Sequence, residues 1–142
     1  MDEPVIAPPH IPLHELLGLE FVDLPEDAGY SEIRMPVRAE AFGFTGNLHG
    51  GAIATLVDLA CAMAAVKATS FDVTKESMVT SDMHLRYVGR PRTANVLARA
   101  EVVRVGSQLI VIDCKVIDDD GHLVAVGDLS MMRVTLRDPL DV

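Results

Sequence analysis

The sequence predicts an α+β fold in which an antiparallel sheet wraps around one long central helix. Two candidate strands come first, a long apolar helical segment follows, and four longer candidate strands come after it. Short turns join the four later strands, and short turns between long strands indicate antiparallel neighbours. Such a sheet has to wrap a single long helix in order to bury it. All 142 residues are expected to form one domain.

The N-terminal part of the chain is expected to hold a short helix and two strands. Residues 1–10 read as a loose arm, and a short helix is expected over 11–19, after Pro12. The stretches 21–25 and 29–37 predict two strands around the acidic turn PEDAG. Pro, Gly and Asp residues of this kind are typical of turns between strands.

The long helix is expected over 50–68, after a loop at 39–51 in which four of 13 residues are glycines. No polar stripe marks a solvent-facing side of this helix, so we expect it to be buried on nearly all sides. One apolar stripe consists of Ile53, Leu56, Val57, Ala60, Met63 and Ala64. The neighbours of Asp58 at three and four positions are Ala54, Thr55, Cys61 and Ala62.

Four strands are expected after the polar connector that follows the helix. They cover residues 77–89, 94–105, 107–118 and 122–136. Alternation in the first strand puts one set of side chains on one face and a polar set on the other. The first set is Val79, Ser81, Met83, Leu85 and Tyr87, and the second is Thr80, Asp82, His84 and Arg86. The Asp-Gly pair within 118–121 favours a tight hairpin, and residues 137–142 are expected to be loose.

The composition excludes several classes of function. A net charge of -9 argues against nucleic acid or an anionic membrane surface as the main partner. Cys61 and Cys114 are spaced neither as a disulfide framework nor as a metal site, so we expect buried free thiols. The N-terminus lacks the basic and apolar pattern of a signal peptide, and no segment is flanked like a membrane span. We therefore expect a cytoplasmic protein that binds neither a metal nor a membrane.

Asp58 is an unusual residue in its surroundings, because a carboxylate on an apolar helix is costly to bury without a partner. The small residues around it leave room for a ligand. The helix starts at Gly50 and Gly51, where free N–H groups and the positive end of the helix dipole favour an oxyanion. Asp58 follows Gly50 by about 12 Å along the helix axis, at about 1.5 Å per residue. This separation suggests a site built from two subunits.

The motif LHGGAIATLVD, in which Asp58 follows His49 by nine residues, resembles hotdog-fold acyl-CoA thioesterases of the phenylacetyl-CoA thioesterase (PaaI-like) type. Gly46 and the later stretch VTSDMHLRYVGRP add to the likeness, which runs from about Leu13 to Val134. The resemblance implies two such units paired edge to edge in a homodimer, and often a dimer of dimers. It also implies an active site at the dimer interface, an acyl-CoA substrate, and no cofactor besides the CoA of the substrate.

The resemblance assigns roles to four residues of the motif and of the following strand. Asp58 matches the family's catalytic carboxylate, acting as a general base on water or as a nucleophile. Gly50 matches the backbone N–H that polarises the thioester carbonyl, and His49 matches the histidine that braces the loop around that oxygen. Thr80 falls where relatives carry a Ser or Thr that helps to place the water. A thioester carbonyl is already activated, so a carboxylate and one N–H donor can suffice for hydrolysis.

The resemblance also implies where CoA is held. The turn YVGRPR (87–92) and the hairpin VGSQ (105–108) fall where relatives hold the nucleotide and the pantetheine. Arg90 and Arg92, helped by Arg86 or Lys67, are the expected partners of the CoA phosphates. The residues expected to bind substrate or CoA are Asn47, Gly51, Ser81, Tyr87, Val88, Gly89, Arg90, Pro91, Arg92, Gly106, Ser107 and Gln108.

One position departs from the family pattern. Many relatives carry an asparagine six residues before the histidine, where it makes a second contact to the carbonyl, and this chain has Gly43 there. Asn47 is a candidate substitute. Two other functions stay open: a non-catalytic acyl-CoA-binding protein, and a hydratase or dehydratase that would use His49 and Asp58. The acyl group, the choice between dimer and tetramer, and the choice between base and nucleophile also stay open.

Overall fold

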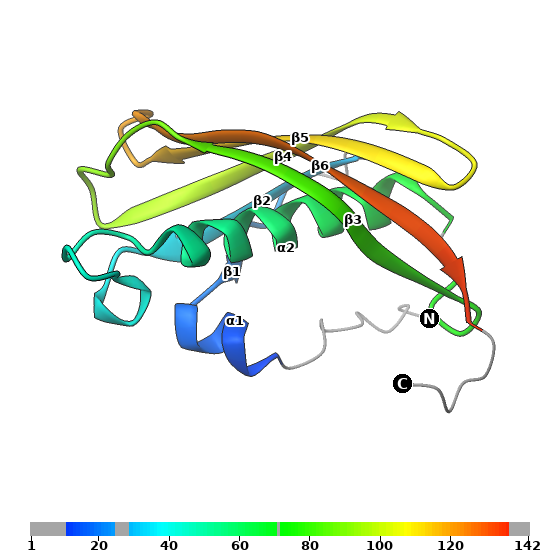
Figure 1. The fold of residues 1–142 in the computed structure, drawn as a ribbon, viewed down its shortest axis with the longest axis horizontal. Coiled ribbons are helices and arrows are strands. Elements are labelled where there is room, and N and C mark those ends of the chain that lie inside the picture. Colours follow the sequence, from blue (N-terminus) through cyan, green and yellow to red (C-terminus); the bar gives the residue numbers. More distant parts are fainter. Residues whose placement is uncertain (1–10, 25–28, 71, 137–142) are drawn as a thin grey trace.

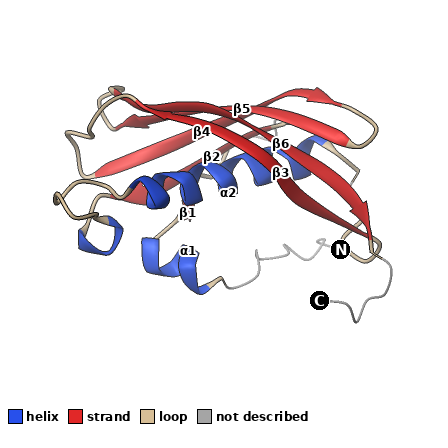
Figure 2. Ribbon diagram, viewed as in Figure 1, coloured by secondary structure: helices blue, strands red, loops and turns tan. Residues whose placement is uncertain are grey.

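In the part of the chain that the structure describes, one six-stranded antiparallel sheet curls around a long helix (Figure 1). The structure, a computed structural model, describes residues 11–24, 29–70 and 72–136. The strands lie in the order β1-β2-β4-β5-β6-β3. Their bounds are β1 Glu20–Phe21, β2 Tyr30–Pro36, β3 Glu76–Tyr87, β4 Asn95–Val105, β5 Leu109–Asp118 and β6 Leu123–Thr135. The helices are α1 Pro12–Leu17, the 3-10 turn η1 Ala39–Ala41 and α2 Gly50–Ala68 (Figure 2).

The predicted fold class is confirmed, because α2 lies along the inner side of the sheet and is the only long helix in the described part of the chain (Figure 1). Its sheet-facing side packs against apolar residues that alternate along β2, β4 and β5. The buried residues of α2 are Ala52, Ile53, Leu56, Val57, Ala60, Cys61, Ala64 and Ala65. By length and composition α2 could also cross a membrane, but this buried stripe makes it the core helix of the sheet.

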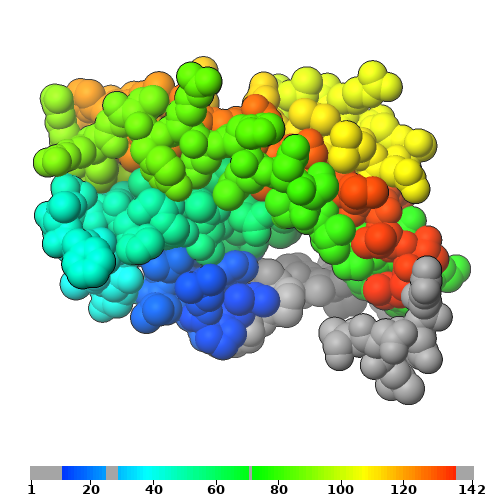
Figure 3. Space-filling model, in the orientation of Figure 1, coloured from blue at the N-terminus to red at the C-terminus, as the bar shows by residue number. Residues whose placement is uncertain are grey.

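The prediction that α2 is buried on nearly all sides is wrong within one chain. The sheet covers one side only, while Ala54, Thr55 and Ala62 are half-buried and Asp58 is exposed. Figure 3 shows part of α2, in teal, at the surface between α1 and β3. The exposed side is as apolar as the buried one, so the sequence pattern could not distinguish them.

Two strand predictions need correction. The strand expected over 21–25 is limited to β1, which spans only Glu20–Phe21. In β3 the register against β6 shifts between Thr80 and Asp82, which marks a β-bulge. The extra residue moves Thr80 to the helix side of the sheet, where the alternation had placed its neighbour Ser81. The predictions for residues 1–10, most of the acidic turn and 137–142 lie outside the described residues.

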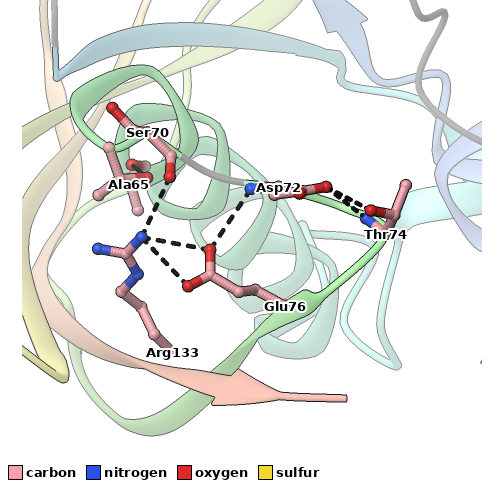
Figure 4. A network of polar contacts seen from close by, with 7 residues as sticks. Ala65, Ser70, Asp72, Thr74, Glu76 and Arg133 are labelled. Atoms are coloured by element: carbon pink, nitrogen blue, oxygen red, sulfur yellow. Dashed lines mark hydrogen bonds and ion pairs between the residues drawn. The ribbon is translucent and has the colours of Figure 1, made fainter. Parts of the chain in front are cut away.

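A network of polar contacts ties the end of α2 to the ends of β3 and β6 (Figure 4). The Arg133 guanidinium donates to the Ser70 carbonyl at 3.1 Å and to the Glu76 carboxylate at 3.2 Å. The Asp72 carboxylate accepts the Thr74 N–H at 2.9 Å and the Thr74 hydroxyl at 2.6 Å. These contacts fix where β3 begins, and therefore how it runs beside α2 toward the helix start.

Candidate active site

The start of α2 presents one free backbone donor. His49 caps the helix: its Nδ1 accepts the Gly51 N–H at 2.8 Å, and its carbonyl accepts the N–H groups of Ala52 and Ile53. The His49 N–H itself donates to the Ala41 carbonyl at 2.7 Å, which holds the loop in place. Among the described residues none accepts the Gly50 N–H. Of the two glycines, Gly50 is therefore the one whose N–H is available to an oxyanion.

Asp58 lies two turns further along α2, on the exposed side of the helix. Its Oδ1 accepts a hydrogen bond from the Thr80 hydroxyl at 2.7 Å, and within the described chain Oδ2 has no partner. The expected pocket of small side chains is not closed in one chain. Instead Asp58 lies beside Ala54 and Ala62 on a half-covered apolar surface. A carboxylate held at one oxygen and free at the other is oriented to accept a proton or to attack a carbonyl.

Strand β3 supplies the contacts to both ends of this arrangement. Thr80 reaches Asp58 because of the bulge, and Tyr87, at the end of the strand, donates its hydroxyl to the Gly50 carbonyl at 2.8 Å. Ser81, at the bulge itself, donates its hydroxyl to the Ser130 carbonyl at 3.1 Å, so this hydroxyl links β3 to β6. The side-chain contacts between β3 and α2 could not be predicted from local patterns in the sequence, because the partners are 22 and 37 residues apart.

The loop after β3 is fixed by its backbone. The N–H groups of Val88 and Gly89 donate to the Val124 carbonyl at 2.9 and 3.1 Å. A side chain at Gly89 would overlap the Leu123 carbonyl oxygen, so this close approach requires glycine. The side chains of Arg90 and Arg92 are exposed, while the backbone at the start of this loop is held by the hydrogen bonds to Val124. Such an arrangement suits arginines that receive a phosphate from solvent.

Asp118 anchors this loop, a role that the sequence did not predict. The residue is 2% exposed, and its carboxylate accepts backbone N–H groups from Arg92, Asp120 and His122 at 2.9, 3.0 and 2.9 Å. Burial by itself would raise the pKa of the Asp118 carboxyl, but these hydrogen bonds and the nearby His122 ring outweigh it and lower the pKa. The DDDG stretch predicts the contacts within the turn. It could not indicate the hydrogen bond from the Arg92 N–H, because Arg92 lies 26 residues away.

The structure does not bring together all of the predicted CoA-binding residues. Gly106–Gln108 connect β4 to β5 and lie at the opposite end of β4 from the 87–92 loop (Figure 1). One chain therefore cannot present both segments to the same part of one CoA molecule. Asn47 directs its amide to the Thr45 hydroxyl at 3.0 Å, so the substitute for the family asparagine is engaged elsewhere.

The two cysteines are part of the core. Cys61 and Cys114 are buried free thiols, as expected. A hydrogen bond with Cys114 and burial raise the pKa of the Cys61 thiol far above its usual range, which makes the thiol unreactive. Among the described residues, no group of three or more His, Cys, Asp or Glu side chains is placed to hold a metal ion.

Comparisons with known proteins identify the family. The model of the thioesterase superfamily matches residues 45–125, which is more than half of the chain and includes α2 and β3. A relative from Halobacterium salinarum, named "Putative esterase VNG_1336C", is 34% identical over 125 residues, which are 80% of this chain and 81% of the relative.

Solved structures share the fold. A mutant of thioesterase PA1618 from Pseudomonas aeruginosa has a TM-score of 0.79 and 26% identity, over 87% of this chain and 86% of that one. The PaaI protein of the E. coli phenylacetic acid degradation operon shares the fold at a TM-score of 0.73 and 22% identity, over 85% and 83% of the chains. BH2602 from Bacillus halodurans, solved with CoA, has 31% identity and a TM-score of 0.66, over 72% and 66%. The chain thus has the hotdog fold and belongs to the thioesterase superfamily, which confirms the predicted resemblance and class of enzyme.

Proposed function

We propose that this protein hydrolyses acyl-CoA thioesters to the free acid and CoA. The observation that carries the proposal is the pair formed by the Thr80 hydroxyl and the Asp58 carboxylate, which leaves one carboxylate oxygen free on an exposed side of the helix. The same helix starts at Gly50, whose N–H has no partner in the described part of the chain. A base and an oxyanion donor are the minimum that an activated thioester requires.

The site is proposed to form between two chains. Asp58 and the Gly50 N–H of one chain are about 12 Å apart along α2, too far to contact one carbonyl group together. A second copy would bring its own Gly50 N–H opposite Asp58. Two features support this pairing: the half-buried apolar side of α2, and the outer edge of β3, which pairs only with β6 in the described sheet. An unpaired strand edge next to an apolar surface is suited to a partner chain.

The proposed reaction has two forms. As a general base, Asp58 takes a proton from water while the water oxygen attacks the carbonyl carbon. The Gly50 N–H stabilises the resulting oxyanion, and collapse of the intermediate breaks the C–S bond and releases CoA, whose thiolate takes up a proton. As a nucleophile, Asp58 attacks the carbonyl carbon, releases CoA and leaves an anhydride that water then cleaves. In both forms Thr80 orients the carboxylate.

CoA is proposed to bind along the 87–92 loop, without a further cofactor. Arg90 and Arg92 lie exposed on that loop and give it a local positive charge, although the net charge of the chain is -9. The solved relative with CoA supports this class of ligand. Gly106–Gln108 could contribute only from the second chain, since they lie at the far end of β4.

The test is thioester hydrolysis, followed by release of free thiol, over short, long and aromatic acyl-CoAs. We expect turnover by the wild type and a loss of about a hundredfold or more in kcat for Asp58→Asn. Asp113→Asn is the matched control, because Asp113 is an exposed carboxylate on β5, between the buried residues Ile112 and Cys114. Wild type that binds CoA but turns over no acyl-CoA would refute the proposal and leave the non-catalytic binding protein.

A further inference from the structure

We infer that Tyr87 is a positioning residue that holds the start of α2 in the geometry required of the oxyanion donor. This inference rests on the proposed function for its catalytic meaning, but its structural part can be measured without substrate. The family resemblance places Tyr87 among the residues expected to bind CoA. Its contacts in the structure are instead made to Gly50, the residue whose N–H is the proposed donor.

The contacts of Tyr87 and His49 meet on one peptide group. The Tyr87 hydroxyl donates to the Gly50 carbonyl oxygen at 2.8 Å, and the N–H of the same peptide group, that of Gly51, donates to His49 Nδ1 at 2.8 Å. The peptide plane between Gly50 and Gly51 is therefore held at both ends. Because both neighbours of this peptide bond are glycines, nothing in their own side chains restricts its rotation.

We call these two hydrogen bonds on the Gly50–Gly51 peptide group the clamp, and it also limits the direction of the Gly50 N–H. That N–H belongs to the preceding peptide group, and the two dihedral angles of Gly50 alone relate it to the clamped plane. The Tyr87 ring also lies against the Gly50 backbone, because a Cβ atom built at Gly50 would be 3.3 Å from its Cζ. An oxyanion donor is effective only when it is directed at the developing charge before the reaction starts.

The position of Tyr87 also connects the donor to the proposed CoA loop. Tyr87 is the last residue of β3, and the next two residues are fixed by the Val124 carbonyl. Arg92, further along, is fixed by buried Asp118. The loop proposed to bind CoA and the donor proposed to polarise the thioester are thus joined through one side chain, which is itself 53% exposed.

The test uses Tyr87→Phe, which removes only the hydroxyl group. Tyr30→Phe is the matched control, because the Tyr30 hydroxyl also makes one hydrogen bond, to Glu32 at 2.7 Å, and the Tyr30 carbonyl accepts from Lys67 near the far end of α2. Two quantities are measured: kcat and KM on the best acyl-CoA, and the amide hydrogen exchange of Gly50 and Gly51 in the free protein.

We expect Tyr87→Phe to lower kcat by about tenfold with KM unchanged, as for loss of one hydrogen bond, and to speed exchange at Gly51. Tyr30→Phe should do neither. A higher KM with unchanged kcat would overturn the inference and return Tyr87 to CoA binding, and unchanged exchange at Gly51 would overturn it even if kcat fell. Absence of turnover in the wild type would refute the proposed function alone, since the exchange measurement still decides whether Tyr87 holds the peptide.

Discussion

Replacing Gly43 by asparagine should raise turnover under the proposed function, because the family resemblance implies an asparagine at this position that makes a second contact to the thioester carbonyl. The structure has room for the side chain. A Cβ atom at Gly43 would lie 3.6 Å from the nearest atoms of His49, an ordinary van der Waals contact, and the backbone there does not require glycine. The Gly43 N–H keeps its bond to the Asn47 carbonyl at 2.8 Å. We therefore expect the free energy of unfolding to change by less than about 1 kcal/mol.

The size of the gain follows from what one oxyanion donor contributes. Removing such a donor from an optimised site costs about a hundredfold to a thousandfold in kcat. An added amide beside His49 has not been optimised in this chain, so we expect a gain of about tenfold, well below that limit. The assay is the same measurement of thiol release, with kcat and KM determined separately.

Gly43→Ala is the matched control, because it adds the same Cβ atom without the amide. It should leave kcat unchanged and stabilise the loop slightly. If Gly43→Asn and Gly43→Ala fold equally well and have the same kcat, the second carbonyl contact has no role in this chain. The Gly50 N–H would then be sufficient by itself.

Two further predictions concern the elements that hold the site. Because the folded-state pKa of Asp118 lies below its value in the unfolded chain, its stabilisation is present at neutral pH and is lost as the pH falls through the folded-state value. Asp118→Asn, which turns an amide toward the Arg92 N–H, should lower Tm at pH 7 and flatten the loss of stability below about pH 4 in denaturant titrations; an unchanged acid profile would contradict this. Gly127→Ala places a methyl group on the His84 carbonyl oxygen and should cost about 1–3 kcal/mol by forcing β3 away from β6. Gly121→Ala, strained only by a φ of +85°, should cost about 1 kcal/mol, and equal losses for the two would count against the overlap at His84.

Most of the fold was predictable from local patterns. The glycine-rich loop and the apolar run gave the bounds of α2 as observed, and alternation with short turns gave β4, β5 and β6 to within two residues. These signals are local, since a helix or a strand is favoured by residues a few positions apart. The strand at 21–25 failed because such a short segment depends on its partner β2 more than on its own residues.

The candidate site was only partly predictable. Asp58 and Gly50 were identified because a lone carboxylate and paired glycines contrast with their neighbours along the chain. The match to the family motif added His49 and Thr80. Asp118 was missed because its burial and its contact to Arg92 depend on a segment 26 residues away. No local pattern distinguishes a buried turn aspartate from a solvated one.

The sequence by itself determined the order of the elements, the position of the long helix and the identity of its one carboxylate, because each of these depends on residues near one another in the chain. Tertiary structure alone decided which side of α2 is covered, since the helix is apolar all round and either side could have faced the sheet. It also decided that Thr80 reaches Asp58, because a bulge of one residue moves a side chain to the other face of a strand. The clamp of Tyr87 on Gly50 has the same origin: two segments 37 residues apart meet only when the sheet closes around the helix.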